Sequence, residues 1–398
     1  MSDAQNIEVY PAAAVKPAQP PPAAPTWLDG RPRIGIHTSI AGDPANALEI
    51  AARIGCTALQ IFSGSPRMWP RPHQRQIPAD VAQRFRERRA ALCLGPVAVH
   101  ANYLINLAAP DPRQWQNSVE AFRDELIRAA QLGAEYLIVH PGSPRDSGID
   151  CGIEAVAEAV SRAYGGAGFS KNPSEREEQP AFSSSPVGPV RVLFENTAGQ
   201  GTGLASEFGH LRRLLEGCRA RGVTPAPGIC LDTAHLLAAG FEIRTPEGLD
   251  RTLAEANAAF GLENVCVMHC NDSKSALGSR RDRHEHIGRG QIGRQAFARI
   301  LNHPLLRSPE RAFLAETPID RPGDDRRNVR ALWSLLGLTP PRPKKIRHPE
   351  PAAAGEGPAV RASRARRRSL SRRRSPSSRG STRRRHRSRR ISSSRSRR

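Results

Sequence analysis

The feature that most constrains this chain is an alternation of strand-like and helix-like segments that repeats eight times. Short apolar runs bounded by turn signals predict strands, and the longer amphipathic runs between them predict helices. The expected strands cover residues 34–39, 58–62, 96–100, 136–140, 191–195, 228–235, 265–269 and 312–316. The expected helices cover residues 46–55, 79–93, 115–133, 153–165, 206–218, 246–261, 293–301 and 324–338.

Eight such units within about 300 residues predict an α/β fold, the (β/α)8 TIM barrel. Continuous apolar strands such as YLIV (136–139) and VCVM (265–268) suit a parallel sheet that is covered on both faces. An open, doubly wound sheet is the alternative. In a barrel of this kind the chemistry lies at the carboxyl ends of the strands, so the residues found there are the first candidates for a site.

Ionisable side chains stand at most of these strand ends. Those at or just after the predicted strands are His100, His140, Glu195, Asp232, His235, His269 and Glu316, while Asp282 and His284 follow the seventh strand on a loop. A hydrophobic core has no use for an ionisable group at every strand end, whereas a metal cluster needs such groups. Imidazole nitrogen and carboxylate oxygen are suitable ligands for Zn2+ or Mn2+.

Such a ligand set favours phosphate chemistry. Four carboxylates would leave three divalent ions with a net positive charge, which suits a phosphodiester. One ion can generate hydroxide from water at neutral pH, while the others hold the non-bridging and departing oxygens. Two further histidines are expected to have lesser roles: His37 is predicted to be structural, and His286 to lie beside the site or in solvent.

Charge and composition divide the chain into three parts. Residues 341–398 contain 22 of the 60 Lys and Arg residues and two of the 38 acidic residues, so the remainder is nearly neutral. We expect a disordered Pro/Ala-rich lead over residues 1–32, a barrel domain over 33–340, and a disordered Arg/Ser-rich tail over 341–398. A disordered insertion is expected at 165–189, on the face opposite the site.

The tail offers contacts to nucleic-acid phosphates that do not depend on base sequence, although a non-functional extension is the alternative. Seven cysteines without a C-x-x-C pair favour reduced thiols in a cytosolic or nuclear compartment. The N-terminus lacks the pattern of a signal peptide, and no run of ~18 apolar residues predicts a membrane span.

Four stretches resemble the endonuclease IV family of apurinic/apyrimidinic (AP) endonucleases. They are HANYLINLAAP (100–110), FENTAGQGTGL (194–204), CLDTAHLLAAGFEIRT (230–245) and HCNDSKSALGSRRDRHEHIGRGQIG (269–293). The third is similar to the signature D-T-x-H-x-x-A-x-G, and the fourth to H-x-N-D-x-K-x-x-x-G-S-x-x-D-R-H. The resemblance covers roughly residues 33–338 and implies a TIM barrel that holds three zinc ions, with Mn2+ as an alternative at one position.

The resemblance also implies a role for each candidate. His100 and His140 would bind the first zinc, and Glu195 would bridge it to the second and orient a zinc-bound hydroxide as the catalytic carboxylate. Asp232, His269 and Glu316 would complete the second zinc site, and His235, Asp282 and His284 would bind the third. Arg67, Tyr103 and Leu104 match positions that enter DNA and promote flipping of the abasic nucleotide. A surface charge at Arg67 and a packed aromatic ring at Tyr103 are the alternatives.

The implied activity is base excision repair of DNA. The family cuts double-stranded DNA 5′ to an abasic site, leaves a 3′-hydroxyl and a 5′-deoxyribose phosphate, and trims blocked 3′ ends. We expect a monomer in a bacterial cytoplasm, associated with the nucleoid, or in the nucleus if the source is eukaryotic. Two other functions remain open: a sugar isomerase or epimerase on a related barrel, and a non-catalytic nucleic-acid binder driven by the tail.

Overall fold

The computed structural model describes residues 30–69, 75–165 and 190–342. The predicted lead, insertion and tail lie outside these ranges except at their edges. The strands are β1 (Arg33–Thr38), β2 (Leu59–Phe62), β3 (Val97–His100), β4 (Tyr136–Val139), β5 (Arg191–Glu195), β6 (Gly228–Asp232), β7 (Val265–His269), β8 (Asp272–Ser273), β9 (His284–Glu285) and β10 (Ala312–Ala315). The α-helices are α1 (Ala45–Ile54), α2 (Ala79–Leu92), α3 (Pro112–Leu132), α4 (Ile149–Gly165), α5 (Phe208–Ala220), α6 (Thr233–Ala239), α7 (Pro246–Phe260), α8 (Gly293–Asn302) and α9 (Asp324–Leu335).

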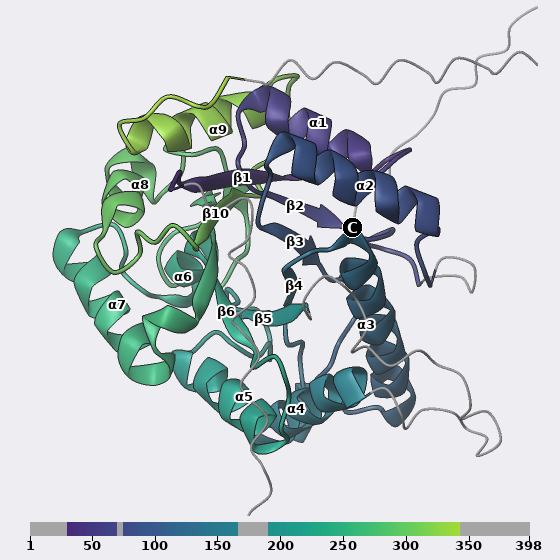
Figure 1. Cartoon of the computed structure of the whole chain (residues 1–398). Helices are drawn as coiled ribbons and strands as arrows, with labels where there is room; N and C mark the ends of the chain where they lie inside the picture. Colours follow the sequence, from purple (N-terminus) through teal and green to yellow (C-terminus); the bar gives the residue numbers. More distant parts are fainter. Residues whose placement is uncertain (1–29, 70–74, 166–189, 343–398) are drawn as a thin grey trace, which may run out of the picture. The chain divides into compact units, whose positions relative to one another are not determined.

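Eight strands close into a parallel barrel. Their order around it is β1-β10-β7-β6-β5-β4-β3-β2, and β1 pairs with both β2 and β10 to complete the ring. The helices surround these strands, with α6 lying inside the outer ring of helices near the end of β6 (Figure 1). The predicted (β/α)8 barrel is confirmed, and the open, doubly wound sheet is wrong because the two edge strands of such a sheet would not pair.

Local signals account for the ends of the longest helix. The Asp111 side chain caps the N-terminus of α3 by accepting a hydrogen bond from the Gln114 N–H at 2.7 Å. Pro112 occupies the first turn, where its missing N–H costs no helical hydrogen bond. Gly133 ends the helix with a left-handed backbone, φ 70°, as a C-terminal glycine does. This end agrees with the predicted one.

The prediction was wrong about the end of the sixth strand. The expected strand 228–235 stops at Asp232, and helix α6 begins at Thr233. The Asp232 side chain caps α6 by accepting from the His235 N–H at 2.8 Å, which fixes the switch from strand to helix. His235 therefore lies on a helix. The two-residue strands β8 and β9 pair antiparallel, an element that the sequence did not predict, and β9 begins at His284, which was expected on a loop.

Two layers of apolar side chains form the core. The larger lies between the strands and the helices. The smaller fills the barrel and consists of Ala58, Ala98, Ile138, Leu193, Cys230, Cys266, Val267, Ala312 and Leu314. All seven cysteines are free. Among the residues that the structure describes, no helix is both long and apolar enough to cross a membrane.

The barrel filling decides where the candidate residues point. Successive side chains of a strand face opposite sides, so a residue two positions beyond an inward-facing one also faces inward. Six candidates come two positions after a residue of the smaller cluster, which faces the inside of the barrel. They are His100 after Ala98, His140 after Ile138, Glu195 after Leu193, Asp232 after Cys230, His269 after Val267 and Glu316 after Leu314. The pleat thus brings all of these side chains to the carboxyl-terminal opening of the barrel.

Gly35 allows β1 to approach its neighbours closely. A Cβ atom there would collide with the Ala58 carbonyl and lie 2.7 Å from the Leu314 Cδ2. We expect Gly35→Ala to lower the free energy of unfolding by about 1–3 kcal/mol, because β1 must shift within a packed barrel. Thermal and denaturant unfolding would measure this. Gly209→Ala is the matched control, since a Cβ there meets nothing within 4 Å; equal stability of the two variants would contradict this account of the packing.

Candidate metal centre

The structure brings all nine predicted side chains together at one end of the barrel. They form three overlapping groups, and within each group the potential ligand atoms lie within 4.8 Å of one another. The groups are His100, His140 and Glu195; Glu195, Asp232, His269 and Glu316; and Asp232, His235 and His284. Asp282 joins the third group through its contacts with His235 and His284. Each group contains both imidazole nitrogen and carboxylate oxygen, the donor types that divalent transition metals prefer.

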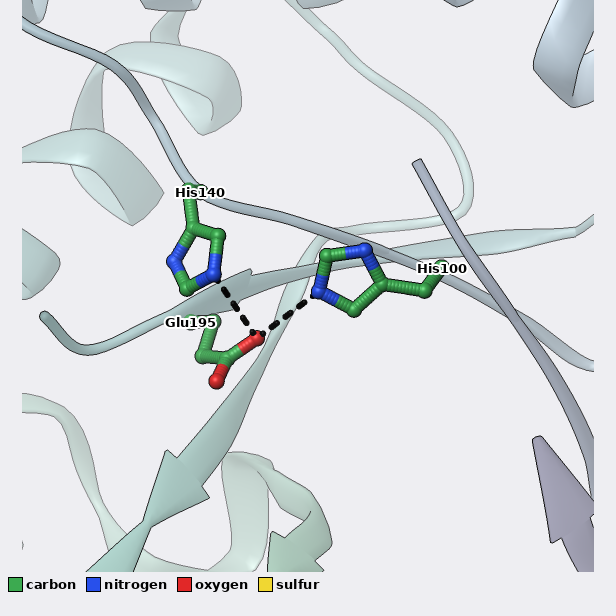
Figure 2. A group of neighbouring side chains, drawn as sticks. All are labelled: His100, His140 and Glu195. Carbon is green, nitrogen blue, oxygen red and sulfur yellow. Dashed lines mark hydrogen bonds and ion pairs between the residues drawn. The ribbon is translucent and has the colours of Figure 1, made fainter. Parts of the chain in front are cut away.

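Glu195 links the groups because its two carboxylate oxygens face different histidines. Oε2 lies 3.3 Å from His100 Nε2 and 3.7 Å from His140 Nε2, and Figure 2 shows both imidazoles directed at this oxygen. Oε1 lies 3.0 Å from His269 Nδ1 and 3.4 Å from His235 Nδ1. A carboxylate placed in this way can bridge two cations, one on each oxygen.

The second group is the deepest. His269 Nδ1 lies 3.3 Å from Glu316 Oε2 and 3.9 Å from Asp232 Oδ2, besides its contact with Glu195. The side chains of His269 and Asp232 have no solvent exposure, and that of Glu195 has 1%. Three carboxylates buried this closely would repel one another without a cation between them.

The third group joins α6 to the segment that precedes β9. Asp282 places one carboxylate oxygen 3.2 Å from His235 Nε2 and the other 3.1 Å from His284 Nε2. His284 Nε2 also lies 3.7 Å from Asp232 Oδ2, yet this buried nitrogen has no hydrogen-bond partner of good geometry among the described residues. A buried nitrogen without a hydrogen bond, surrounded by carboxylates, is suited to bind a metal ion.

The far nitrogen of several imidazoles is held by a hydrogen bond that leaves the near nitrogen available. His100 Nδ1 donates to the Ala101 carbonyl at 2.8 Å, and His235 Nδ1 donates to the Asn196 carbonyl at 2.9 Å. His269 Nε2 donates to Gln60 Oε1 at 2.8 Å. Metal-binding histidines use this arrangement to fix the tautomer and the ring orientation. The residues present therefore fit a metal cluster.

Neutral side chains that were not predicted hold the carboxylates in place. Gln60 Nε2 donates to Glu316 Oε1 at 2.5 Å, and Asn271 Nδ2 donates to Asp232 Oδ2 at 2.6 Å. Asn196 accepts from the Asp232 N–H at 2.6 Å through Oδ1. The two asparagines could have been found from their places directly after His269-Cys270 and Glu195. Gln60 left no such signal, because one amide within an apolar strand looks like an ordinary core residue.

Two other histidines take different places. His37, predicted to be structural, lies beside the cluster, with Nδ1 3.6 Å from Glu316 Oε1 and 2.9 Å from Gln60 Nε2. Its role is to support Glu316 and Gln60 from the neighbouring strand. His286 faces away from the cluster, towards Asp320 at 3.4 Å and Asn328 at 3.0 Å.

Cys230 is a further possible ligand that the sequence did not suggest. Its sulfur lies within the same 4.8 Å span as Glu195 and His269. Burial raises the pKa of the Cys230 thiol to about 12, so the thiol keeps its proton near neutral pH. Because a metal binds the thiolate rather than the thiol, the carboxylates are the better ligands here.

Electrostatics show that the cluster is arranged around positive charge. Burial by itself raises the pKa of Glu195, but the charges of His140 and His269 outweigh it and hold the pKa well below its usual range. Burial lowers the pKa of His284, but Asp232 and Asp282 outweigh it and raise the pKa to about 9. Without a metal, protons on His235, His269 and His284 balance the carboxylates, whereas burial lowers the pKa of His140. A divalent cation would take the place of those protons.

The three predicted DNA-contact residues lie at the rim of the cluster. Arg67 is exposed on the segment after β2, and Leu104 is half-buried. The Tyr103 side chain is 57% exposed, and its ring centroid lies 5.8 Å from that of His100. The Tyr103 ring also lies against Phe62, at 5.4 Å between centroids, so it is packed where it meets Phe62 and His100 and is exposed elsewhere.

Comparisons with known proteins agree with this geometry. A family model described as "Xylose isomerase-like TIM barrel" matches residues 48–332. A protein of Solibacter usitatus named "Probable endonuclease 4" is 44% identical over 318 residues, which cover 79% of this chain and 100% of the relative. A protein with the same name from Methanoculleus marisnigri is 38% identical, over 76% of this chain and 99% of the relative.

Solved structures separate the family from the wider fold. The crystal structure of endonuclease IV from Thermus thermophilus matches with a TM-score of 0.62 and 36% identity, over 77% of this chain and 99% of that one. A D-tagatose 3-epimerase-like protein matches with a TM-score of 0.52 and 16% identity, over 76% of this chain and 97% of that one, so it shares the fold alone. Within the xylose isomerase-like TIM barrels, this chain belongs to the endonuclease IV family.

Proposed function

We propose that this protein is a zinc-dependent AP endonuclease of base excision repair. It would hydrolyse the phosphodiester 5′ to an abasic site in double-stranded DNA, giving a 3′-hydroxyl and a 5′-deoxyribose phosphate. Family membership makes the chain a DNA-cleaving hydrolase of the endonuclease IV type. The observation that carries the finer proposal is Glu195, whose two oxygens each face a different pair of histidines within a cluster of nine ligands.

Three zinc ions would occupy the three ligand groups described above. When bound, such ions supply Lewis acidity, which lowers the pKa of water and offsets the charge on a phosphate. Glu195 orients the attacking water, because its carboxylate lies between the first and second groups. Gln60 and Asn271 keep Glu316 and Asp232 in position by hydrogen bonds. Arg67, Tyr103 and Leu104 hold the DNA where the abasic nucleotide leaves the stack.

The same centre would trim blocked 3′ ends, since that reaction also breaks one phosphodiester and needs no further group on the protein. We propose a monomer, since a single chain supplies every ligand of the three groups. We also propose that the protein lies in the cytoplasm and associates with the nucleoid, because its proposed substrate is DNA.

The first prediction concerns the metal. Zinc-loaded protein should contain about three zinc ions per chain by elemental analysis. It should cut a duplex oligonucleotide at a single abasic site and remove a 3′-blocking phosphate ester. Chelation should abolish both reactions and lower the melting temperature, because metal binding stabilises only the folded state.

Restoring zinc should recover both the activity and the melting temperature. Metal-loaded protein that leaves the abasic duplex intact would contradict the proposed function. Incision that survives complete removal of the metal would contradict the proposed centre while leaving the family assignment in place.

The second prediction concerns Glu195. Glu195→Gln keeps the size of the side chain but removes the charge that the four surrounding histidines face. We expect incision to fall at least about 100-fold, with the fold retained, because a group acting on the reacting atoms is lost. Single-turnover incision and far-UV circular dichroism would measure the two effects. Glu216→Gln, which changes a half-exposed carboxylate on α5 paired with Arg212, is the control and should behave as the unchanged protein.

The third prediction concerns the Arg/Ser-rich tail, which lies outside the described residues. The full chain and a chain ending at residue 340 should cut abasic DNA at similar rates when substrate is saturating. Binding of DNA by the full chain should depend more steeply on salt, because more counterions are released. Fluorescence anisotropy over a range of NaCl concentrations gives both slopes. Equal slopes would mean that the tail does not contact DNA, and loss of cutting by the shorter chain would mean that the barrel does not cut without the tail.

A further inference from the structure

Exposed apolar side chains gather beside the metal centre. Among the described residues, the large hydrophobic side chains that are exposed are Met68, Trp69, Tyr103, Leu277, Leu305, Ile319 and Leu338. Three of these seven lie on two adjacent segments, residues 64–69 and 101–104, with exposures of 61% for Met68, 43% for Trp69 and 57% for Tyr103. Large apolar groups left in water at a substrate rim indicate a contact surface.

One buried side chain ties the two segments together. Asn102 is 6% exposed, and its Nδ2 donates to the carbonyls of Ser65 at 2.7 Å and Met68 at 2.8 Å. Its Oδ1 accepts from the Leu104 N–H at 2.8 Å. A single amide group therefore uses both of its donors on the first segment and its acceptor on the second.

A backbone bond completes the link. The Tyr103 N–H donates to the Pro66 carbonyl at 3.1 Å, which brings the residue before Arg67 alongside Tyr103. Below them, the Tyr103 ring packs edge-on against Phe62, at 5.4 Å between centroids. The side chains of Met68 and Tyr103 are exposed, while the Met68 carbonyl is held by Asn102 and the Tyr103 N–H by the Pro66 carbonyl.

The base of the first segment is also held. Ser63 donates to the Glu125 carboxylate and accepts from Arg128 Nε at 2.7 Å, and Arg128 pairs with Glu125 at 3.0 Å. These two side chains of α3 are buried, with exposures of 4% and 3%. With its base fixed to α3, the outer part of the segment is held by the two bonds that Asn102 donates and by the bond from the Tyr103 N–H.

We propose that Asn102 is a positioning residue that joins the two segments into one rigid apolar wedge, and that Met68 is a further DNA-contact residue within it. This inference rests on the proposed function. When an abasic nucleotide leaves the duplex, the flanking base pairs lose stacking, and an apolar side chain that enters the gap restores contact. Met68 suits an irregular gap because its side chain is unbranched and polarisable.

The rigidity of the wedge strengthens its binding to DNA. A flexible segment would lose conformational freedom each time it entered DNA, and this cost would weaken binding. Asn102 fixes the segment before the substrate arrives, as supporting hydrogen bonds do around well-ordered sites. Asn102 therefore acts through Met68 and Tyr103, without touching the reacting phosphate.

Two variants of the zinc-loaded full chain test this inference. Asn102→Asp keeps the acceptor for Leu104 but loses both donations and places a carboxylate against two carbonyl oxygens. Met68→Gln keeps the length of the side chain and makes its end polar. We expect each to lower kcat/KM for incision of an abasic duplex, about 10- to 30-fold for Asn102→Asp, which loses two hydrogen bonds. The fluorescence of 2-aminopurine next to the lesion should report less unstacking on binding.

The control reaction is hydrolysis of bis(4-nitrophenyl) phosphate, a small diester that needs no opening of a base stack. Both variants should hydrolyse it at the rate of the unchanged protein and keep its zinc content. Asn302→Asp is the matched control variant, since Asn302 Nδ2 also donates to two carbonyls, at 2.8 and 2.9 Å, but at the end of α8. It should leave all four readouts unchanged.

The outcomes are distinct. Equal losses on the duplex and on the small diester would mean that Asn102 supports the metal centre or the fold, and would overturn the inference. Unchanged incision by both variants would overturn it as well. If the unchanged protein hydrolyses the small diester but leaves the abasic duplex intact, the proposed function itself fails, and the role of the wedge in opening DNA falls with it.

Discussion

The structure depends on one geometric constraint, the two-residue pleat of eight parallel strands closed into a ring. Each strand that fills the barrel with an apolar side chain must direct the side chain two residues later to the same axis. Ile138 is followed by His140 and Leu193 by Glu195, and the same step repeats around the ring. Candidate ligands more than 200 residues apart in the sequence meet because the barrel closes, and no single segment could hold them together.

Burying so many charges is costly, and the structure offsets the cost in two ways. Acids and imidazoles alternate, so that Glu195 has histidines on both sides and His269 lies among carboxylates. Around them, neutral amides satisfy several of the remaining lone pairs and N–H groups, as Gln60 does for both His269 and Glu316. Such supporting bonds fix the orientation of the side chains that they reach.

Much of the fold and the grouping of the candidate side chains could be predicted because both follow from periodicity. The eight strands stood out as apolar runs, and the ionisable residues at the ends of six of them had no role in a hydrophobic core. The strand-to-helix switch at Thr233 could not be predicted, because TAHLLAA suits either element until the Asp232 carboxylate caps the helix. The places of Gln60 and His37 were also missed. Both contact Glu316, which follows β10, and β10 lies beside β1 only after the barrel closes. The role of Asn102 could not be predicted either, because its hydrogen-bond acceptors, the Ser65 and Met68 carbonyls, lie on a loop whose path the sequence does not reveal.

Access to solvent differs among the three ligand groups. The central one, with His269 and Asp232 at 0% and Glu195 at 1% exposure, is enclosed. The outer ones each have an open side, through His140 at 34% and Asp282 at 42%. Ions bound in these groups would therefore exchange with the medium at unequal rates, with the peripheral positions emptied first and the central one last. A chelator added for a short time would then remove a bound cation from the outer groups before it reached one in the central group.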